Sequence, residues 1–227
     1  MAPPAALRRT PVYIICSPRP RVGKTLLARL LVEFLLLQHG DVLAFDINLN
    51  EPSLLDYHPR LTETATIDDT FGQMQLMDRI IANDGVPKVI DLGFHVFDNF
   101  FRVLGEIGFV KEAFGRGVEP IVLFMLDRDS ISARAWAMLR AQFGRLATVP
   151  VNNDMVLLGE LPDWLGPTKT FDVALLPDFL KGYITRTNFS FTAFVKDRRN
   201  SASELYDWTR DIYRQFREIE LRLLLRS

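Results

Sequence analysis

The sequence has only one cysteine, Cys16, in 227 residues, so no disulfide can form within the chain. A chain without an internal disulfide suits a reducing compartment, and a lone cysteine at the end of an apolar stretch is typical of a small buried core residue. The first ten residues lack the apolar run of a signal peptide, and the longest run in the first predicted helix, residues 34–37, is far too short to cross a bilayer. These absences predict a cytoplasmic protein.

Acidic side chains are missing from residues 1–30, although the whole chain has a formal net charge of only -1. The basic residues of this segment are Arg8, Arg9, Arg19, Arg21, Lys24 and Arg29. The overall charge gives no general argument for nucleic acid or a membrane as a partner. The local excess instead concentrates positive charge around one loop, although an ordinary solvated edge would explain Arg8 and Arg9 equally well.

The chain also lacks internal repeats and low-complexity linkers, and its composition, 48% apolar and 24% charged, is ordinary, so we expect one domain over residues 1–227. Strands are predicted at 12–16, 42–46, 89–92, 120–126, 147–151 and 173–176, and helices at 24–39, 66–83, 97–114, 132–143 and 203–225. Continuous apolar runs separated by helices are typical of a parallel sheet covered on both faces. The predicted fold is therefore α/β, a three-layer sandwich with a mostly parallel sheet.

Several boundaries are marked by glycine or by turn residues. Gly40 is a helix stop for residues 24–39, whereas Gly105 and Gly108 argue against one unbroken helix over 97–114. Residues 47–60 are expected to form a loop, and residues 177–179 a turn. The helix at 66–83 rests on the spacing of Ile67, Phe71, Met74, Met77 and Ile81, and the C-terminal amphipathic helix on Leu205, Trp208, Ile212, Phe216, Ile219 and Leu223.

The most informative stretch is the loop between the first strand and the first helix, which ends in Gly23-Lys24-Thr25. This triplet is typical of the end of a phosphate-binding P-loop. Glycine lets the backbone approach a phosphate, Lys24 would reach the β- and γ-phosphates, and the Thr25 hydroxyl would bind Mg²⁺. The helix that follows presents unpaired N–H groups and the positive end of its dipole to an anion. Pro18 stands where the standard motif has its first glycine, and the alternative is an ordinary strand-to-helix turn with an exposed lysine.

Two later strands each end near a carboxylate, Asp46 and Asp91. Ligands of open α/β sheets bind outside the carboxyl ends of the strands, so the loop, Asp46 and Asp91 are expected to converge on one crevice. There Asp91 would hold Mg²⁺ through a water, and Asp46 would orient or activate the water that attacks the γ-phosphate. Each acid could instead be a turn residue.

In the order and spacing of these features, residues 12–176 resemble the MinD/ParA family of P-loop ATPases. The loop Arg19-Pro20-Arg21-Val22-Gly23-Lys24-Thr25 is similar to the family pattern Lys-Gly-Gly-x-Gly-Lys-Thr. The resemblance assigns Arg19 to the family's signature lysine, which reaches across a dimer to the partner's nucleotide. It places the contacts with the nucleotide phosphates at Pro20, Arg21, Val22, Gly23, Lys24, Thr25 and Leu26.

Three more segments are similar to the same family. Residues 44–54 resemble its switch I, in which an Asp helps catalysis, and Asp46 matches that position. Residues 89–94 resemble its switch II, with Asp91 as the matching acid, so that the resemblance places the metal at Thr25, Asp46 and Asp91. Residues 149–153 look like the strand end at which the family has an adenine-contacting Asn. We assign Asn152 to it, with Asn153 as the alternative.

The resemblance implies an ATPase that binds ATP and Mg²⁺, forms a nucleotide-dependent homodimer, and uses slow hydrolysis to position or segregate a cargo through a protein partner. Lys24, Asp46 and Arg19 would be its catalytic residues. The chain departs from the family at Pro20, which lacks an N–H, and at Arg21, whose Cβ makes left-handed dihedrals costly. Leu92-Gly93 also replaces the usual two prolines after the switch II acid.

These departures keep other functions open. A nucleotide-dependent binding module with little or no hydrolysis is the main alternative, and a synthetase of the cobyrinate diamide or dethiobiotin type ranks last, because no glutaminase motif is recognisable. Arginines of the C-terminal helix could suit an anionic membrane or DNA. Acids alternate with them, however, so a solvated face with i,i+4 pairs is favoured. His39, His58 and His95 have no metal-ligand spacing and are expected in surface or turn roles.

Overall fold

The computed structural model describes residues 9–47 and 53–224, with side chains as far as residue 222. Within this part of the chain, seven strands form one sheet, and every neighbouring pair is parallel. The strands are β1 (Thr10–Cys16), β2 (Leu43–Ile47), β3 (Thr62–Thr64), β4 (Lys88–Leu92), β5 (Val118–Met125), β6 (Ala147–Asn153) and β7 (Phe171–Val173). The predicted parallel α/β sheet is confirmed.

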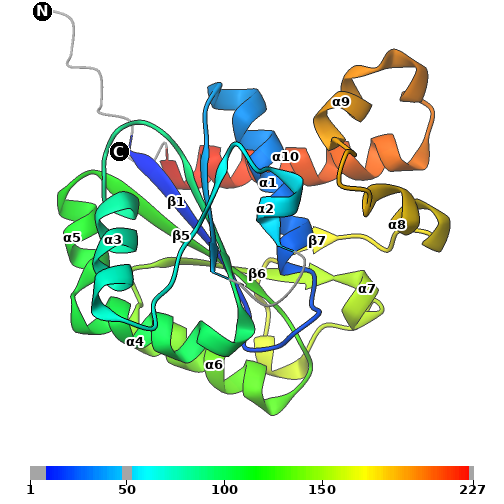
Figure 1. Cartoon of the computed structure of the whole chain (residues 1–227). Coiled ribbons are helices and arrows are strands. Elements are labelled where there is room, and N and C mark those ends of the chain that lie inside the picture. The colour runs from blue at the N-terminus through cyan, green and yellow to red at the C-terminus, as the bar shows by residue number, and fades with distance from the viewer. Residues whose placement is uncertain (1–8, 48–52, 225–227) are drawn as a thin grey trace, which may run out of the picture.

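Helices cover both faces of this sheet (Figure 1). They are α1 (Lys24–His39), α2 (Leu54–Tyr57), α3 (Thr70–Ile80), α4 (Phe97–Glu106), α5 (Phe109–Gly115), α6 (Ser130–Gln142), α7 (Asp154–Leu157), α8 (Asp178–Ile184), α9 (Phe191–Lys196) and α10 (Glu204–Leu224), with short 3₁₀ turns at Phe94–Val96, Asp163–Leu165 and Arg198–Asn200. One face of the sheet packs against α3, α4, α5 and α6, and the other against α1 and α10. The arrangement is the three-layer sandwich that the sequence predicts.

The order of strands across the sheet is β3-β2-β4-β1-β5-β6-β7. The chain moves from β1 to one side for β2, β3 and β4, and then to the other side for β5, β6 and β7. The direction of winding therefore reverses beside β1. In open α/β sheets, ligands bind at the carboxyl ends of the strands next to such a reversal, and the loop that follows β1 starts there.

Helix α1 has the predicted bounds, and a glycine stands at each end of it. Gly23 precedes the helix with φ 96°, and Gly40 follows it with φ 81° and donates its N–H to the carbonyl of Leu36. Glycine takes such left-handed dihedrals without the steric cost of a side chain. The first turn of α1 is therefore held at a defined place directly after the loop.

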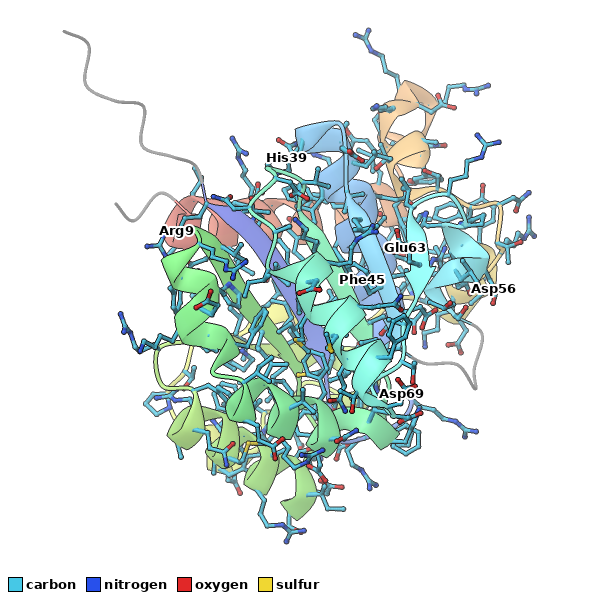
Figure 2. The ribbon with its side chains drawn as sticks, turned by 60° about the vertical axis from the view of Figure 1, so that its left-hand side comes forward. Arg9, His39, Phe45, Asp56, Glu63 and Asp69 are labelled. Atoms are coloured by element: carbon cyan, nitrogen blue, oxygen red, sulfur yellow. The ribbon has the colours of Figure 1, made fainter. Side chains whose placement is uncertain are left out.

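The segment 47–60 is not wholly a loop, contrary to the prediction. It contains α2, where the side chains of Ser53 and Asp56 each accept from the other residue's backbone N–H, and β3 follows at the sheet edge. Phe45 of β2 and Glu63 of β3, both labelled in Figure 2, pair in register. A helix of four residues and a strand of three are too short to leave a periodic signal in the sequence. Residues 48–52 of the predicted switch I lie outside the described part.

The predicted helix at 97–114 and the predicted turn at 177–179 both differ from the observed elements. Residues 97–114 form two helices, α4 and α5, because Gly108 takes φ 65° between them. The predicted turn at 177–179 is wrong, since Asp178 already opens α8. Proline often occupies the residue just before or at a helix start, and Pro177 precedes this one.

Helix α3 begins later than predicted, and part of its apolar spacing faces solvent. Leu76 and Ile80 are buried, whereas Phe71 and Met74 are 69% and 60% exposed. The buried stripe passes through Gly72, whose ideal Cβ position lies only 2.6 Å from the carbonyl oxygen of Thr66. Gly72 packs against the backbone without an apolar side chain, so the hydrophobic pattern could not show this part of the buried face. Of the predicted residues, Met77 is buried and Ile81 packs against the core, whereas Phe71 and Met74 are misplaced.

Helix α10 agrees with the predicted C-terminal helix to within one residue at each end. Its predicted apolar stripe is buried from Leu205 to Ile219, while the side chain of Leu223 lies outside the described part. Arg214 pairs with Asp211 and Glu218, which supports a solvated charged face. Among the described residues, no helix combines the length and the apolar character needed to cross a membrane.

Candidate functional site

Asp46 and Asp91 project from the face of the sheet that α1 covers. Side chains alternate along a strand, and Ala44 of β2 and Val89 of β4 pack in the same core cluster as α1. Asp46 and Asp91 follow them by two residues, and the two acids lie opposite each other in the register of β2 and β4. Both are 1% exposed, so two buried carboxylates lie side by side at the carboxyl ends of neighbouring strands.

The start of α1 contacts one of these carboxylates, and α2 contacts the other. Thr25 donates its Oγ1 hydrogen to Oδ2 of Asp91 at 2.7 Å, which joins residues 66 positions apart in the chain. Asp46 accepts a hydrogen bond from the backbone N–H of Leu55 at 3.3 Å, so α2 is attached to the second carboxylate. The structure thus brings together the three residues that the sequence assigned to the metal.

Lys24 and Arg19 are both engaged within the chain. Lys24 is 8% exposed, and its Nζ donates to the backbone carbonyl of Arg19 at 2.8 Å. The Arg19 Nε lies 2.7 Å from Oδ2 of Asp129, whose other oxygen accepts from the N–H of Ser132 at the start of α6. Sequence reasoning missed Asp129. Only the strand order, which puts β5 beside β1, could have indicated that the connection after β5 meets this loop.

The loop backbone contains a non-glycine residue in the left-handed region. Arg21 has φ 58°, followed at Gly23 by φ 96°. For a residue other than glycine this backbone conformation costs about 1–2 kcal/mol. Such strain persists only where the surrounding structure fixes it, often at functional sites. The sequence indicated that left-handed dihedrals would be costly at Arg21, and the loop adopts them. Pro20 directly precedes this residue, and Val22 directly after it is buried.

At the end of β6, the structure places Asn153 rather than Asn152 against the loop. Asn153 is buried, and its Nδ2 donates to the carbonyl of Val22 at 3.0 Å. Asn152 instead donates to the carboxylates of Asp154 and Asp172. Side chains alternate along a strand, so Asn153 points to the same face of the sheet as the buried residues 149 and 151, which pack in the same core cluster as α1. Counting this alternation along the strand could have identified Asn153, from the sequence alone, as the residue that contacts the loop; the assignment of an adenine contact to Asn152 stays a prediction.

The contact between Gly23 and Asn153 gives a prediction. With this loop as the phosphate site expected from the sequence, Gly23→Ala is expected to weaken ATP binding by about tenfold or more, a loss of about 1.4 kcal/mol, because the new Cβ would lie 2.5 Å from Nδ2 of Asn153. Gly40→Ala is the matched control, since Gly40 also has a positive φ but nothing lies within 4 Å of its Cβ position. Titration with a fluorescent ATP analogue measures the difference, and melting temperatures check the fold. Equal affinities of the two variants would contradict a role for this contact.

A cavity of about 300 Å³ adjoins the first turn of α1. Its walls include Thr25, Leu26, Arg29, Tyr57, Met155 and Lys181. The guanidinium of Arg29 lies 3.6 Å from the ring centroid of Tyr57 and donates to the carbonyl of Ile184 at 2.9 Å. Burial lowers the pKa of Arg29, while the neighbouring Tyr57 and Glu33 oppose that shift. The volume is at the lower end of the range for small-molecule sites.

Cys16, His39 and His58 have surroundings typical of structural residues. Cys16 is fully buried, and burial raises the pKa of its thiol, as expected for a core residue. His39 contacts Glu220 at the far end of α1, and burial lowers the pKa of His58 at the end of α2. No group of three or more His, Cys, Asp or Glu side chains suited to a metal occurs in the described part of the chain.

Comparison of the sequence with models of known protein families finds no match, and a search of curated proteins finds no relative.

Proposed function

We propose that this protein is a P-loop ATPase that binds Mg²⁺ and ATP and hydrolyses ATP slowly. Its nucleotide state controls a homodimer, in the manner of the MinD/ParA ATPases that its sequence resembles, and the dimer positions or segregates a cargo through a protein partner. One observation carries the proposal: the hydroxyl of Thr25, one residue after the P-loop lysine, is hydrogen-bonded to Asp91, the strand-end acid that the metal role requires.

The oxygens at this site fit Mg²⁺. In phosphate sites this ion usually binds one or two carboxylates and completes its shell with water and phosphate oxygens, so a cluster of three protein acids is not required. Thr25 and Asp91 supply a hydroxyl and a carboxylate, and Asp46 supplies a second carboxylate on the neighbouring strand. The bound ion would neutralise charge on the β- and γ-phosphates.

The start of α1 fits the phosphates themselves. Its first turn contains no acidic residue, and Gly23 offers no side chain to cap its N–H groups. Those N–H groups and the helix dipole favour an anion there. Lys24 would exchange its bond to the Arg19 carbonyl for bonds to phosphate oxygens, and Asp46 would hold the attacking water by accepting its hydrogen bond.

A second candidate function is a nucleotide-dependent binding module with little hydrolysis. Two observations favour it over fast turnover: Pro20 has no N–H to offer a phosphate, and Arg19 is paired with Asp129 in its own chain. Arg19 must leave this ion pair before it can reach a partner's nucleotide. The ion pair is partly exposed, and surface pairs contribute only about 0–1 kcal/mol, so the exchange is energetically accessible.

ATP turnover with Mg²⁺ and gel-filtration mass with ATP, ADP or neither test the proposal together. We expect slow hydrolysis and a dimer that forms only with ATP, and Arg19→Ala is expected to prevent that dimer. Arg128→Ala is the matched control, because Arg128 also follows a strand end but pairs with Glu160 outside the loop. Tight ATP binding without turnover or change of mass would favour the second candidate, and no binding of ATP would refute both.

A further inference from the structure

A second cavity, of about 430 Å³, lies further along α1, on the side away from the phosphate loop. Its walls come from the last turns of α1, the end of α2, and the segment 187–196 that leads into and forms α9. Tyr57 lines both this cavity and the one beside Thr25, and its ring, stacked on Arg29, lies between them. In Figure 1, α2 lies beside α1 on this side of the sheet.

Part of the wall is apolar and open to solvent. Leu36 and Leu37 are 38% and 39% exposed, although α1 is buried through most of its preceding length. Phe189 adds an aromatic surface and is itself packed against Phe191 and Phe194. This wall offers favourable contact to an apolar group of a ligand, because contact would remove exposed leucine surface from water.

Lys196 is the cation that this wall presents to a ligand, and the carboxylate of Glu33 is turned to other partners. Glu33 is already satisfied, since its oxygens accept from the Ser190 hydroxyl at 2.6 Å and from the N–H groups of Phe191 and Thr192 at 3.1 and 2.8 Å. Lys196 is exposed at the rim and has no ion pair with a described residue. His58 is uncharged at neutral pH because burial lowers its pKa.

We infer that this cavity is a binding site for a small amphipathic anion, an aromatic or aliphatic group that carries a carboxylate or sulfonate. The apolar part lies on Leu36, Leu37 and Phe189, and the acid group faces Lys196. The site is separate from the proposed nucleotide site and does not depend on it. Because Tyr57, the last residue of α2, forms part of the wall, a bound ligand would contact α2, and the N–H of Leu55 in this helix is hydrogen-bonded to Asp46.

The dye anilinonaphthalene sulfonate, which is itself an aromatic anion, tests the inference on the full chain without nucleotide. We expect one saturable site per chain, detected as a rise in fluorescence. Ala193→Trp, which fills the cavity, is expected to abolish the saturable signal. Ala141→Trp, on the exposed face of α6, is its matched control and should leave binding unchanged.

Charge reversal provides an independent variant. Lys196→Glu is expected to weaken dye binding by about tenfold, since a like charge replaces an opposite one at the rim, whereas Lys169→Glu at a distant exposed lysine should not. Melting temperatures exclude partly unfolded protein as the source of the signal. Absence of saturable binding, or equal binding by Ala193→Trp and Ala141→Trp, would overturn the inference. Because no nucleotide is present, these outcomes leave the ATPase proposal untouched.

Discussion

Replacement of Lys24 by alanine is expected to lower the affinity for Mg²⁺ and ATP by at least about 100-fold. The side chain is buried at the base of the loop, one residue from the Thr25 hydroxyl, and under the proposed function it exchanges its bond to the Arg19 carbonyl for bonds to phosphate oxygens. A charged hydrogen bond in a desolvated site is worth about 2–5 kcal/mol, and 100-fold corresponds to about 2.7 kcal/mol. Calorimetric or fluorescence titration with ATP measures the loss.

Lys24 also supports the empty loop through its bond to Arg19, so a second variant must separate charge from loop structure. Lys24→Gln retains a donor for the Arg19 carbonyl but has no charge, and it should lose affinity nearly as completely as Lys24→Ala. Lys169→Ala, at an exposed lysine that pairs with Glu218 of α10, is the control. Near-native affinity of Lys24→Gln would show that the positive charge is not what binds the phosphates.

The sequence predicted those site residues whose positions depend only on the order of the strands and on where each strand ends. Thr25, Asp46 and Asp91 each follow or end an apolar run, and in a parallel sheet all such ends lie at one edge. No detail of packing is needed to bring them together, which is why Thr25 meets Asp91 across 66 positions. The same logic predicted the three layers from the alternation of apolar runs and helices.

The features that the sequence did not reveal depend on short elements and on single contacts. Asp129 reaches Arg19 through a connection whose shape has no periodic signature. Helix α2 is only four residues long, and the exposed side of α3 was obscured because Gly72 contributes to packing without an apolar side chain. Asn153 is a different case, because the alternation of side chains along β6 already indicates that Asn153, and not Asn152, faces the loop.

The second large effect is expected at Asp46. Asp46→Asn should lower the rate of ATP turnover by at least about 100-fold, the range in which a positioned acid–base group contributes, while ATP affinity changes by no more than a few fold. An asparagine oxygen can still accept from the N–H of Leu55, so the attachment of α2 is retained. What is lost is the negative charge that polarises and orients the attacking water.

The comparison with two other acids makes the Asp46 result specific. Asp41→Asn, at an exposed acid before β2, should leave both turnover and affinity unchanged. Asp91→Asn removes the partner of the Thr25 hydroxyl, so it should raise the Mg²⁺ concentration needed for binding, which Asp46→Asn should not do to the same degree. If Asp46→Asn turned over ATP at the native rate, Asp46 would serve only to hold α2 in place. The buried carboxylate would then act as a structural link between the sheet and α2, and the catalytic role proposed for it would have to be withdrawn.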